Sequence, residues 1–327
     1  MSGAPPNVGL VLGAGGVAGG AFHAGALAAL AEVTRWDPRT AAIVVGTSAG
    51  SIAGTGLRAG LSAADSFERS QGRPMSAAGQ RLLGAFGGPP TPPRLRPGLV
   101  PPSPSEVASL LGRAVARPFA ARPTALLAAL LPEGATATDM IRDGVRTFVP
   151  QGWPSDPLWI NAVNRNDGLR ATFGRYGIRD TWPELGDAVA ASCAIPGIFT
   201  PVQIDGASFV DGGVHSPTNA DVLIDAGVSL VIVSSPMSIA GRGLAQLTAG
   251  GPMRRWARLC LDAEIIRLRR RGIAVITLQP TAEDAAIMGP NAMDPSRRSA
   301  IADAIRASTL TRLERADVAD RLALLRR

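Results

Sequence analysis

Short apolar runs that lead into glycine recur at the start of the chain. Residues 8–12 are apolar apart from one glycine, and residues 43–45 form a second apolar run. Each run is followed by a glycine-rich turn and then by small and apolar residues that predict helices over 21–33 and 49–59. The order strand, glycine turn, helix, repeated once, predicts a parallel βαβα unit.

The strand pattern returns in the second half of the chain. Residues 158–165, 169–175 and 207–210 predict further strands. Residues 228–235 and 273–280 are continuous apolar runs, typical of central parallel strands that helices cover on both faces. Helices are expected over residues 182–193, 218–226 and 297–327. Together these elements predict an α/β protein with three α/β/α layers and a mainly parallel central sheet.

Residues 70–137 depart from this pattern. They contain the stretch GGPPTPPRLRPGLVPPSPSE, whose prolines and glycines predict no regular structure. Leucine-rich segments on either side predict short amphipathic helices. We therefore expect one domain over residues 1–327, with 70–137 inserted either as a cap or lid over the active edge of the sheet or as a surface excursion.

The composition is that of a globular protein, with 46% hydrophobic and 18% charged residues in a chain of 327. Its two cysteines, Cys193 and Cys260, are too few for a disulfide framework and favour a reducing compartment. No uninterrupted apolar run approaches the roughly 18 residues of a membrane span, and no basic segment precedes an apolar one at the N-terminus. These features favour a cytoplasmic location.

The net charge of +7 comes from arginine alone, because the sequence contains no lysine. Such a charge favours anionic partners, either lipid headgroups or nucleic acid. Only 4% of residues are aromatic and no nucleic-acid-binding motif is present, which argues against nucleic acid. Residues 252–271 predict a basic amphipathic helix with Met253, Trp256, Cys260 and Ala263 on one face. This helix either packs on the sheet or docks peripherally on an anionic membrane, such as the inner membrane surface.

Ser48 lies in the motif Gly46-Thr47-Ser48-Ala49-Gly50, between a predicted strand and a predicted helix. A serine nucleophile at such a junction sits on a sharp turn, and the residues two before and two after it must be very small so that strand and helix can approach. Gly46 and Gly50 meet this requirement. The motif therefore predicts a nucleophile elbow with Ser48 at its tip.

The first glycine turn allows two interpretations. Gly13, Gly15 and Ala18 match the dinucleotide-binding pattern G-x-G-x-x-G/A. That pattern requires an acidic residue at the end of the second strand, and none stands there. Alternatively, the backbone amides of Gly15 and Gly16, at the start of a helix and on the same sheet edge as Ser48, form an oxyanion hole.

Two residues are candidates for the base that takes the proton of Ser48. Asp211 follows a predicted strand and precedes two glycines, so that its carboxylate can reach the serine from the same sheet edge. An Asp-Gly-Gly sequence can equally be a simple turn. His215 would complete a Ser–Asp–His triad, although it stands only four residues after the acid. His23 lies within the first predicted helix, where packing is its expected role.

These motifs together resemble those of the patatin-like phospholipases. Four segments carry the resemblance: the glycine segment 14–19, the elbow 46–50, the Asp-Gly-Gly at 211–213, and ASCAIPGIFTPV at 191–202, which matches the pattern Ala-Ser-x-Ala-x-Pro-x-x-Phe-x-Pro. The likeness covers residues 8–60 and 158 to about 235. At position 18 the family often has a basic residue, where this chain has alanine.

The resemblance implies a serine acyl hydrolase of the phospholipase or lysophospholipase type that acts on a lipid ester. It implies a catalytic dyad of Ser48 and Asp211 without histidine, an oxyanion hole at Gly15 and Gly16, and no cofactor or metal. Two alternatives remain open. One is an acyltransferase or thioesterase with the same dyad, and the other is a non-catalytic or dinucleotide-binding domain.

Overall fold

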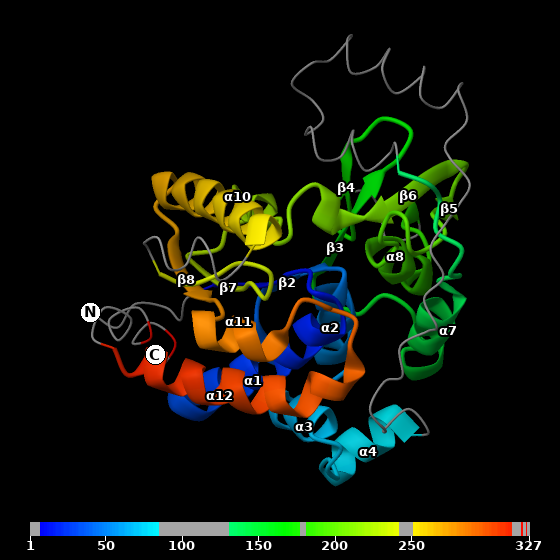
Figure 1. The fold of residues 1–327 in the computed structure, drawn as a ribbon. Coiled ribbons are helices and arrows are strands. Elements are labelled where there is room, and N and C mark those ends of the chain that lie inside the picture. The colour runs from blue at the N-terminus through cyan, green and yellow to red at the C-terminus, as the bar shows by residue number, and fades with distance from the viewer. Residues whose placement is uncertain are drawn as a thin grey trace.

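The computed structural model describes residues 7–84, 131–176, 181–241 and 251–315, together with Leu322 and Leu325. Within these residues an eight-stranded sheet forms the centre of the molecule, in the order β5-β6-β3-β2-β1-β7-β8, with β4 paired to β3 (Figure 1). The stretch 85–130, which holds most of the expected insertion, lies outside the described residues. The assignment of a single domain therefore stays a prediction.

Five strands form the parallel part of the sheet: β1 (Val8–Leu12), β2 (Ile43–Thr47), β3 (Leu158–Asn164), β7 (Leu230–Ser234) and β8 (Ala274–Leu278). The other three strands are β4 (Arg170–Phe173), β5 (Val202–Ile204) and β6 (Ala207–Asp211). β4 and β6 each pair antiparallel with β3, and β5 pairs antiparallel with β6. The sheet is thus mixed, with a parallel half that carries the βαβα unit predicted from sequence.

Helices cover both faces of the parallel half, which confirms the three-layer prediction (Figure 1). Alternate residues of one strand serve the two faces: Leu10 and Leu12 belong to the apolar cluster shared with α1 (Gly16–Thr34) and α12 (Arg298–Leu313). Val11 belongs to the opposite cluster, which includes Leu261 and Leu268 of α10 (Gly251–Arg270). Both faces are apolar because both are buried, as the continuous apolar runs predict.

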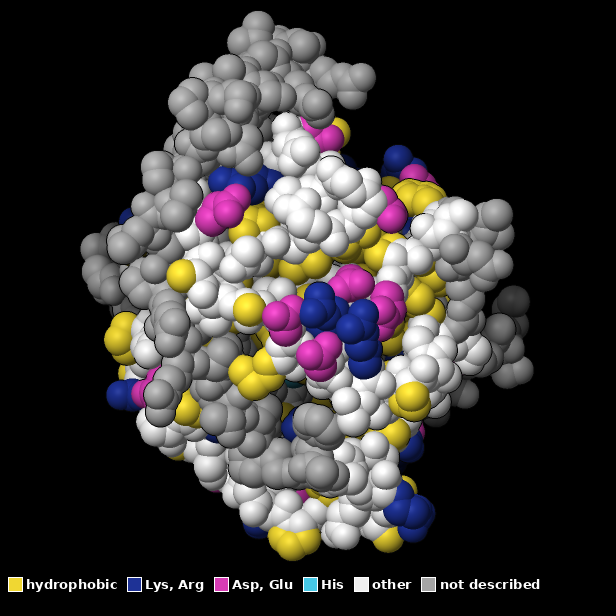
Figure 2. Space-filling view, turned by 90° about the vertical axis from the view of Figure 1, so that its right-hand side faces the viewer, with side chains coloured by type: hydrophobic (Ala, Val, Ile, Leu, Met, Phe, Trp, Pro, Cys, Tyr) yellow, Lys and Arg dark blue, Asp and Glu magenta, His cyan; other side chains and the backbone are white. Residues whose placement is uncertain are grey.

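The remaining helices lie around this core. They are α2 (Ala49–Arg58), α3 (Ala63–Ser70), α4 (Ala77–Leu83), α7 (Asp139–Phe148), α8 (Leu185–Ser192) and α11 (Ala282–Met288), with 3₁₀ turns η1 (Pro38–Thr40), η4 (Gly212–Val214), η5 (Ala220–Leu223) and η6 (Pro295–Arg297). Figure 2 looks onto the side of α7, where arginine and acidic side chains gather. There Arg142 and Arg146 form ion pairs with Asp139, Asp143, Glu184 and Asp187. These pairs join α7 to α8.

The helix expected over residues 218–226 is wrong. Only the 3₁₀ turn η5 forms there, because Asn219 adopts a left-handed backbone conformation with φ of 52°. Its side-chain amide donates to the Thr47 hydroxyl and to the Gly212 carbonyl, each at 3.2 Å. A helix would turn this amide away from those partners. Tertiary hydrogen bonds therefore override the local helical pattern.

Helix α1 is long and apolar enough to cross a membrane, with a mean hydropathy of 1.3 over its 18-residue window, unlike the expectation from sequence. However, 61% of that window is buried inside the protein, as in the core helix of a globular fold. α1 packs closely against α12: a Cβ placed on Gly25 would lie 2.4 Å from the Ala302 carbonyl oxygen. We therefore treat α1 as a core helix whose glycine permits this contact.

The contact between α1 and α12 predicts a difference between two glycines of the same helix. Gly25→Ala should lower the free energy of unfolding by about 1–3 kcal/mol, because the added methyl group meets a backbone carbonyl that cannot rotate away. Gly20 is the matched control, since a Cβ there meets no atom within 4 Å. Gly20→Ala should raise stability by up to about 1 kcal/mol through helix propensity. Urea unfolding measures both values, and equal destabilisation would contradict this packing.

Candidate active site

Ser48 occupies a strained turn between β2 and α2. Its φ of 54° and ψ of −121° lie where a residue with a side chain is rarely found. The flanking glycines make the turn possible. A Cβ on Gly46 would lie 2.5 Å from the Ser51 Cα, and one on Gly50 would lie 1.9 Å from the Leu12 carbonyl oxygen. The local geometry is thus that of the elbow predicted from sequence, with Ser48 only 4% exposed.

Hydrogen bonds from distant residues hold this turn in place. The Ser48 amide donates to the Ser192 hydroxyl oxygen at 2.9 Å, and the Ser192 hydroxyl donates to the Asn161 carbonyl at 2.7 Å. The Ser51 hydroxyl donates to the Ser48 carbonyl at 2.7 Å. Ser192 thereby ties the elbow to strand β3. Sequence reasoning assigned no role to Ser192, and its only signal was its place in the segment 191–202.

Asp211 lies at the end of β6 and is 5% exposed. Burial raises its pKa to about 6, and hydrogen bonds with the Ser48 hydroxyl and the Gly213 amide partly oppose that rise. The Gly213 amide donates to Asp211 Oδ1 at 2.7 Å, and the Asp211 amide donates to the Ala194 carbonyl at 2.9 Å. The structure therefore brings the Ser48 hydroxyl and the Asp211 carboxylate together in a nearly dry environment.

The route by which Asp211 reaches Ser48 differs from the expected one. The sequence suggested the end of a strand parallel to the others, whereas β6 runs antiparallel to β3. Asp211 pairs with Ala162 in the middle of β3, one residue past Asn161, which pairs with Thr47. Because β6 stops at this register, its carboxyl end is level with the end of β2. Although β6 is antiparallel, it thus places Asp211 at the sheet edge where Ser48 lies.

The backbone amides of Gly15 and Gly16 begin helix α1. Among the backbone hydrogen bonds of the described residues, neither amide donates to a carbonyl, while the Ala14 amide donates to Pro217 at 2.8 Å and the Ala18 amide to Ala292 at 2.9 Å. Gly16 has a φ of 60°, which orients this turn without strain. Unpaired amides at a helix N-terminus can hold an anionic oxygen.

The glycine turn and the first residues of α1 lie close to residues that neighbour Ser48 and Asp211 in the sequence. A Cβ on Gly19 would lie 3.5 Å from the Cβ of Ala49, the residue that follows Ser48. A Cβ on Gly213 would lie 3.2 Å from the Ala14 Cβ and 2.9 Å from Asp211 Oδ1. The start of α1 therefore lies beside the residue that follows Ser48 and beside the loop that follows Asp211.

The two histidines lie in different surroundings. His23 is buried in α1, where burial lowers its pKa to about 4 and keeps it neutral at pH 7. Its Nε2–H donates to the Gly13 carbonyl at 2.8 Å, so its Nδ1 accepts from the Ser234 hydroxyl at 2.8 Å. The charge of His215 acts on the pKa of Asp221. Neither histidine is among the groups that shift the pKa of Asp211.

Three further residues support the site and had no assigned role in the sequence. Burial raises the pKa of the Cys193 thiol to about 12, and Asp211 adds to the rise, so that the thiol stays protonated beside Ser48. Asn219 joins the loop after Asp211 to β2 through its amide. Buried Glu264 of α10 accepts from the Thr218 hydroxyl at 2.6 Å. No local pattern marks Asn219 and Glu264, because each acts through a distant partner, whereas Cys193 lies in the segment 191–202.

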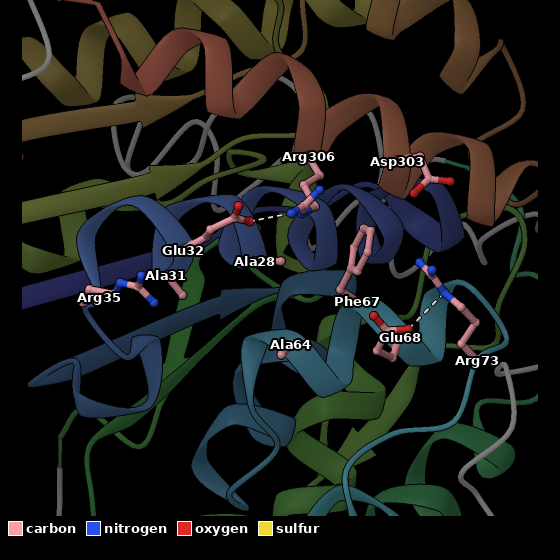
Figure 3. A pocket seen from close by; sticks show the side chains of 10 residues that line it. All are labelled: Ala28, Ala31, Glu32, Arg35, Ala64, Phe67, Glu68, Arg73, Asp303 and Arg306. Atoms are coloured by element: carbon pink, nitrogen blue, oxygen red, sulfur yellow. Dashed lines mark hydrogen bonds and ion pairs between the residues drawn. The ribbon is translucent and has the colours of Figure 1, made fainter.

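A cavity of about 600 Å³ lies elsewhere, between α1, α3 and α12 (Figure 3). Its lining includes two ion pairs, Glu32–Arg306 and Glu68–Arg73. The guanidinium groups of Arg73 and Arg306 lie 5.7 and 5.6 Å from the centre of the Phe67 ring. It contains none of the predicted site residues. Among the described residues, no group of three or more histidine, cysteine or acidic side chains could hold a metal ion.

One family model and two solved structures show similarity to this chain. The family model described as patatin-like phospholipase matches residues 10–224, a range that includes Gly15, Gly16, Ser48 and Asp211. The type III effector protein ExoU is 16% identical with a TM-score of 0.42, over 95% of this chain and 53% of that one. VipD from Legionella pneumophila is 15% identical with a TM-score of 0.44, over 95% and 67%. The chain spans about half the length of ExoU.

The buried carboxyl of Asp211 predicts a stability change that depends on pH. Its pKa is raised from 3.8 to about 6 in the folded protein. Its stabilising contribution is therefore complete below pH 3.8 and is lost as pH rises through about 6. Asp211→Asn should raise the free energy of unfolding at pH 8 by up to about 3 kcal/mol, and by little at pH 4.

Urea unfolding at the two pH values measures this difference. The matched control is Asp205→Asn, which removes a carboxylate from an exposed turn of the same chain. It should change stability little at either pH. A destabilised Asp211→Asn protein at pH 8 would contradict the electrostatic cost assigned to Asp211.

Proposed function

The chain belongs to the patatin-like phospholipases, a family of lipid acyl hydrolases, and from that premise we propose that it cleaves a lipid carboxylic ester through a dyad of Ser48 and Asp211. One observation carries the proposal: a buried serine hydroxyl on a strained turn shares a hydrogen bond with a buried aspartate whose pKa is raised to about 6. A raised pKa makes the carboxylate a stronger base than an exposed aspartate, for which the pKa is about 3.9.

In the proposed reaction Ser48 Oγ attacks the ester carbonyl carbon while Asp211 takes the hydroxyl proton. The amides of Gly15 and Gly16 donate to the oxyanion of the tetrahedral intermediate. The intermediate collapses, and the alcohol leaves with the proton from Asp211. Water then attacks the acyl-serine, Asp211 takes a proton from that water, and the fatty acid leaves as the Ser48 hydroxyl is restored.

The same acyl-enzyme can pass its acyl group to another acceptor, which would make the protein an acyltransferase, or can form from a thioester. Hydrolysis is the proposed outcome, of the phospholipase or lysophospholipase type. Labelling with a fluorophosphonate probe would support a serine hydrolase. Tight NADPH binding without labelling would favour the dinucleotide-binding alternative instead.

The dyad is tested by three single variants. Ser48→Ala should abolish hydrolysis of p-nitrophenyl esters and fluorophosphonate labelling, and Asp211→Asn should lower kcat/KM by several orders of magnitude because the base is lost. His215→Ala should keep kcat/KM within about tenfold of the wild-type value, which corresponds to a change of about 1.4 kcal/mol in the activation barrier. In the wild type, kcat/KM should rise with pH up to about 6 and then level, as Asp211 loses its proton. If a folded His215→Ala protein is as inactive as Ser48→Ala, the catalytic group is a triad that includes His215 and not a dyad.

We further propose that the protein meets its substrate at an anionic membrane, as a cytoplasmic protein peripheral to the inner membrane surface. The support lies in helix α10. Leu259 and Ile266 project outward and are 69% and 50% exposed, whereas Cys260, expected on the apolar face, is buried. Met253, expected on the same face as Cys260, is 57% exposed, so that face is only partly buried.

Arginines flank the exposed apolar pair on α10. Arg255, Arg269 and Arg270 are exposed and form no ion pair among the described residues. Apolar side chains with unpaired arginines at the ends of one helix face suit a surface of anionic headgroups. The helix also lies close to the site: Arg254 donates to the Pro236 carbonyl at 2.8 Å, and the Pro236 ring packs against Gly15.

Vesicle sedimentation tests the membrane proposal. Wild-type protein should bind anionic vesicles at low salt and bind zwitterionic vesicles at least tenfold more weakly. The triple variant Arg255→Gln, Arg269→Gln, Arg270→Gln should lose most of this binding. The control triple variant, Arg39→Gln, Arg73→Gln, Arg306→Gln, removes the same net charge from ion pairs away from α10. Equal losses from both triple variants would reject α10 as the docking surface.

A further inference from the structure

The segment 289–294, which connects α11 to η6 and α12, lies against the start of α1. The Ala292 carbonyl accepts a hydrogen bond from the Ala18 amide at 2.9 Å. A Cβ on Gly16 would lie 2.8 Å from the Met293 sulfur and 2.9 Å from the Ala292 carbonyl oxygen. A segment outside the 10–224 range of the family match therefore covers the glycine turn that offers Gly15 and Gly16 amides.

Met293 also contacts the opposite side of the site. Its partly buried side chain packs against the apolar cluster that includes Ala191, Ala194 and Phe199. These residues belong to the same segment as Ser192, which holds the Ser48 amide. Met293 thus lies against both the glycine turn and the apolar cluster to which residues 191–199 contribute.

The backbone around Met293 is fixed, whereas its side chain can adapt. The Met293 amide donates to Asn291 Oδ1 at 3.0 Å, and the Asp294 amide donates to the Asn291 carbonyl at 3.2 Å. Asp294 in turn accepts from the Ser296 amide at 2.9 Å at the start of η6. A methionine side chain is unbranched and flexible, so it can line an apolar channel and shift as a chain enters. The closed turn keeps its position constant.

We propose that Met293 is a specificity-determining residue, which lines the acyl site above Ser48 and limits the width of the acyl group next to the ester carbon. This inference rests on the proposed hydrolase function. The thioether, which lies beside Gly16, gives the site an apolar wall that suits a straight acyl chain. A carbon substituted with several methyl groups beside the ester would collide with Met293. The substrate class is therefore an ester of an acyl chain that is unbranched beside the carbonyl.

Two variants test this inference through the ratio of kcat/KM values for two substrates. The measurement is kcat/KM for p-nitrophenyl pivalate, which is branched beside the carbonyl, divided by kcat/KM for p-nitrophenyl acetate. Met293→Ala should raise this ratio about tenfold, because it removes the side chain that the methyl groups meet. Met293→Trp should lower the ratio at least fivefold, because the indole fills the same space. Any loss of folded protein cancels in the ratio.

Met288→Ala is the matched control. Met288 lies five positions earlier in α11 but is buried in the main apolar core rather than packed against the cluster that includes Phe199. Its truncation should lower the melting temperature and leave the substrate ratio within twofold of wild type. A general loosening of the C-terminal segments would change the ratio in Met288→Ala as well, and would contradict a specific role for Met293.

The outcomes separate this inference from the function on which it rests. If hydrolysis depends on Ser48 but the ratio stays within twofold of wild type in both Met293 variants, the role of Met293 is wrong and the proposed function stands. If neither ester is hydrolysed, or hydrolysis persists in Ser48→Ala, both are overturned. Ratios that move in opposite directions in the two variants would establish Met293 as the wall of the acyl site.

Discussion

The close approach of α2 to the sheet is the constraint on which the rest of the site depends. Gly50 lies so near the Leu12 carbonyl that any Cβ there would overlap it. This approach forces the chain to turn sharply at Ser48 and to adopt a positive φ, a conformation that costs about 1–3 kcal/mol. The Ser48 amide donates a hydrogen bond to Ser192 and the Ser48 carbonyl accepts one from Ser51, and these bonds hold the turn against that strain. The strained turn, held by these two side-chain hydrogen bonds, thus presents the hydroxyl at the edge of the sheet.

Burial then sets the chemistry of the groups around Ser48. The same loss of water raises the pKa of Asp211 and of Cys193 and lowers that of His23. Each shift favours the neutral form, but the consequences differ. Asp211 becomes a stronger base, Cys193 stays an unreactive thiol, and His23 stays a neutral link between Gly13 and Ser234. The site therefore holds its acid at a cost in stability, as functional sites often do.

Residues far along the chain complete the N-terminal glycine turn. Pro217 and Ser234 accept the amides of Ala14 and Gly13, and Ala292 accepts the amide of Ala18. Two of these three partners, Ser234 and Ala292, lie beyond residue 224, where the family match ends. The C-terminal part of the chain is accordingly a structural component of the candidate oxyanion hole. In the proposed enzyme it also supplies a wall of the acyl site and the membrane-facing helix.

The sequence by itself determined the features that arise from neighbouring residues. Apolar runs predicted the parallel strands, and the glycines at positions 46 and 50 predicted the sharp turn at Ser48, because only glycine tolerates such contacts. Tertiary structure decided what depends on distant partners. It placed β6 antiparallel to β3 and set the register that brings Asp211 level with Ser48. It left only a 3₁₀ turn after Asn219, where a helix was expected, and it placed Met293 next to Gly16. These contacts join residues far apart in the chain, and such pairs leave no periodic pattern for a single sequence to reveal.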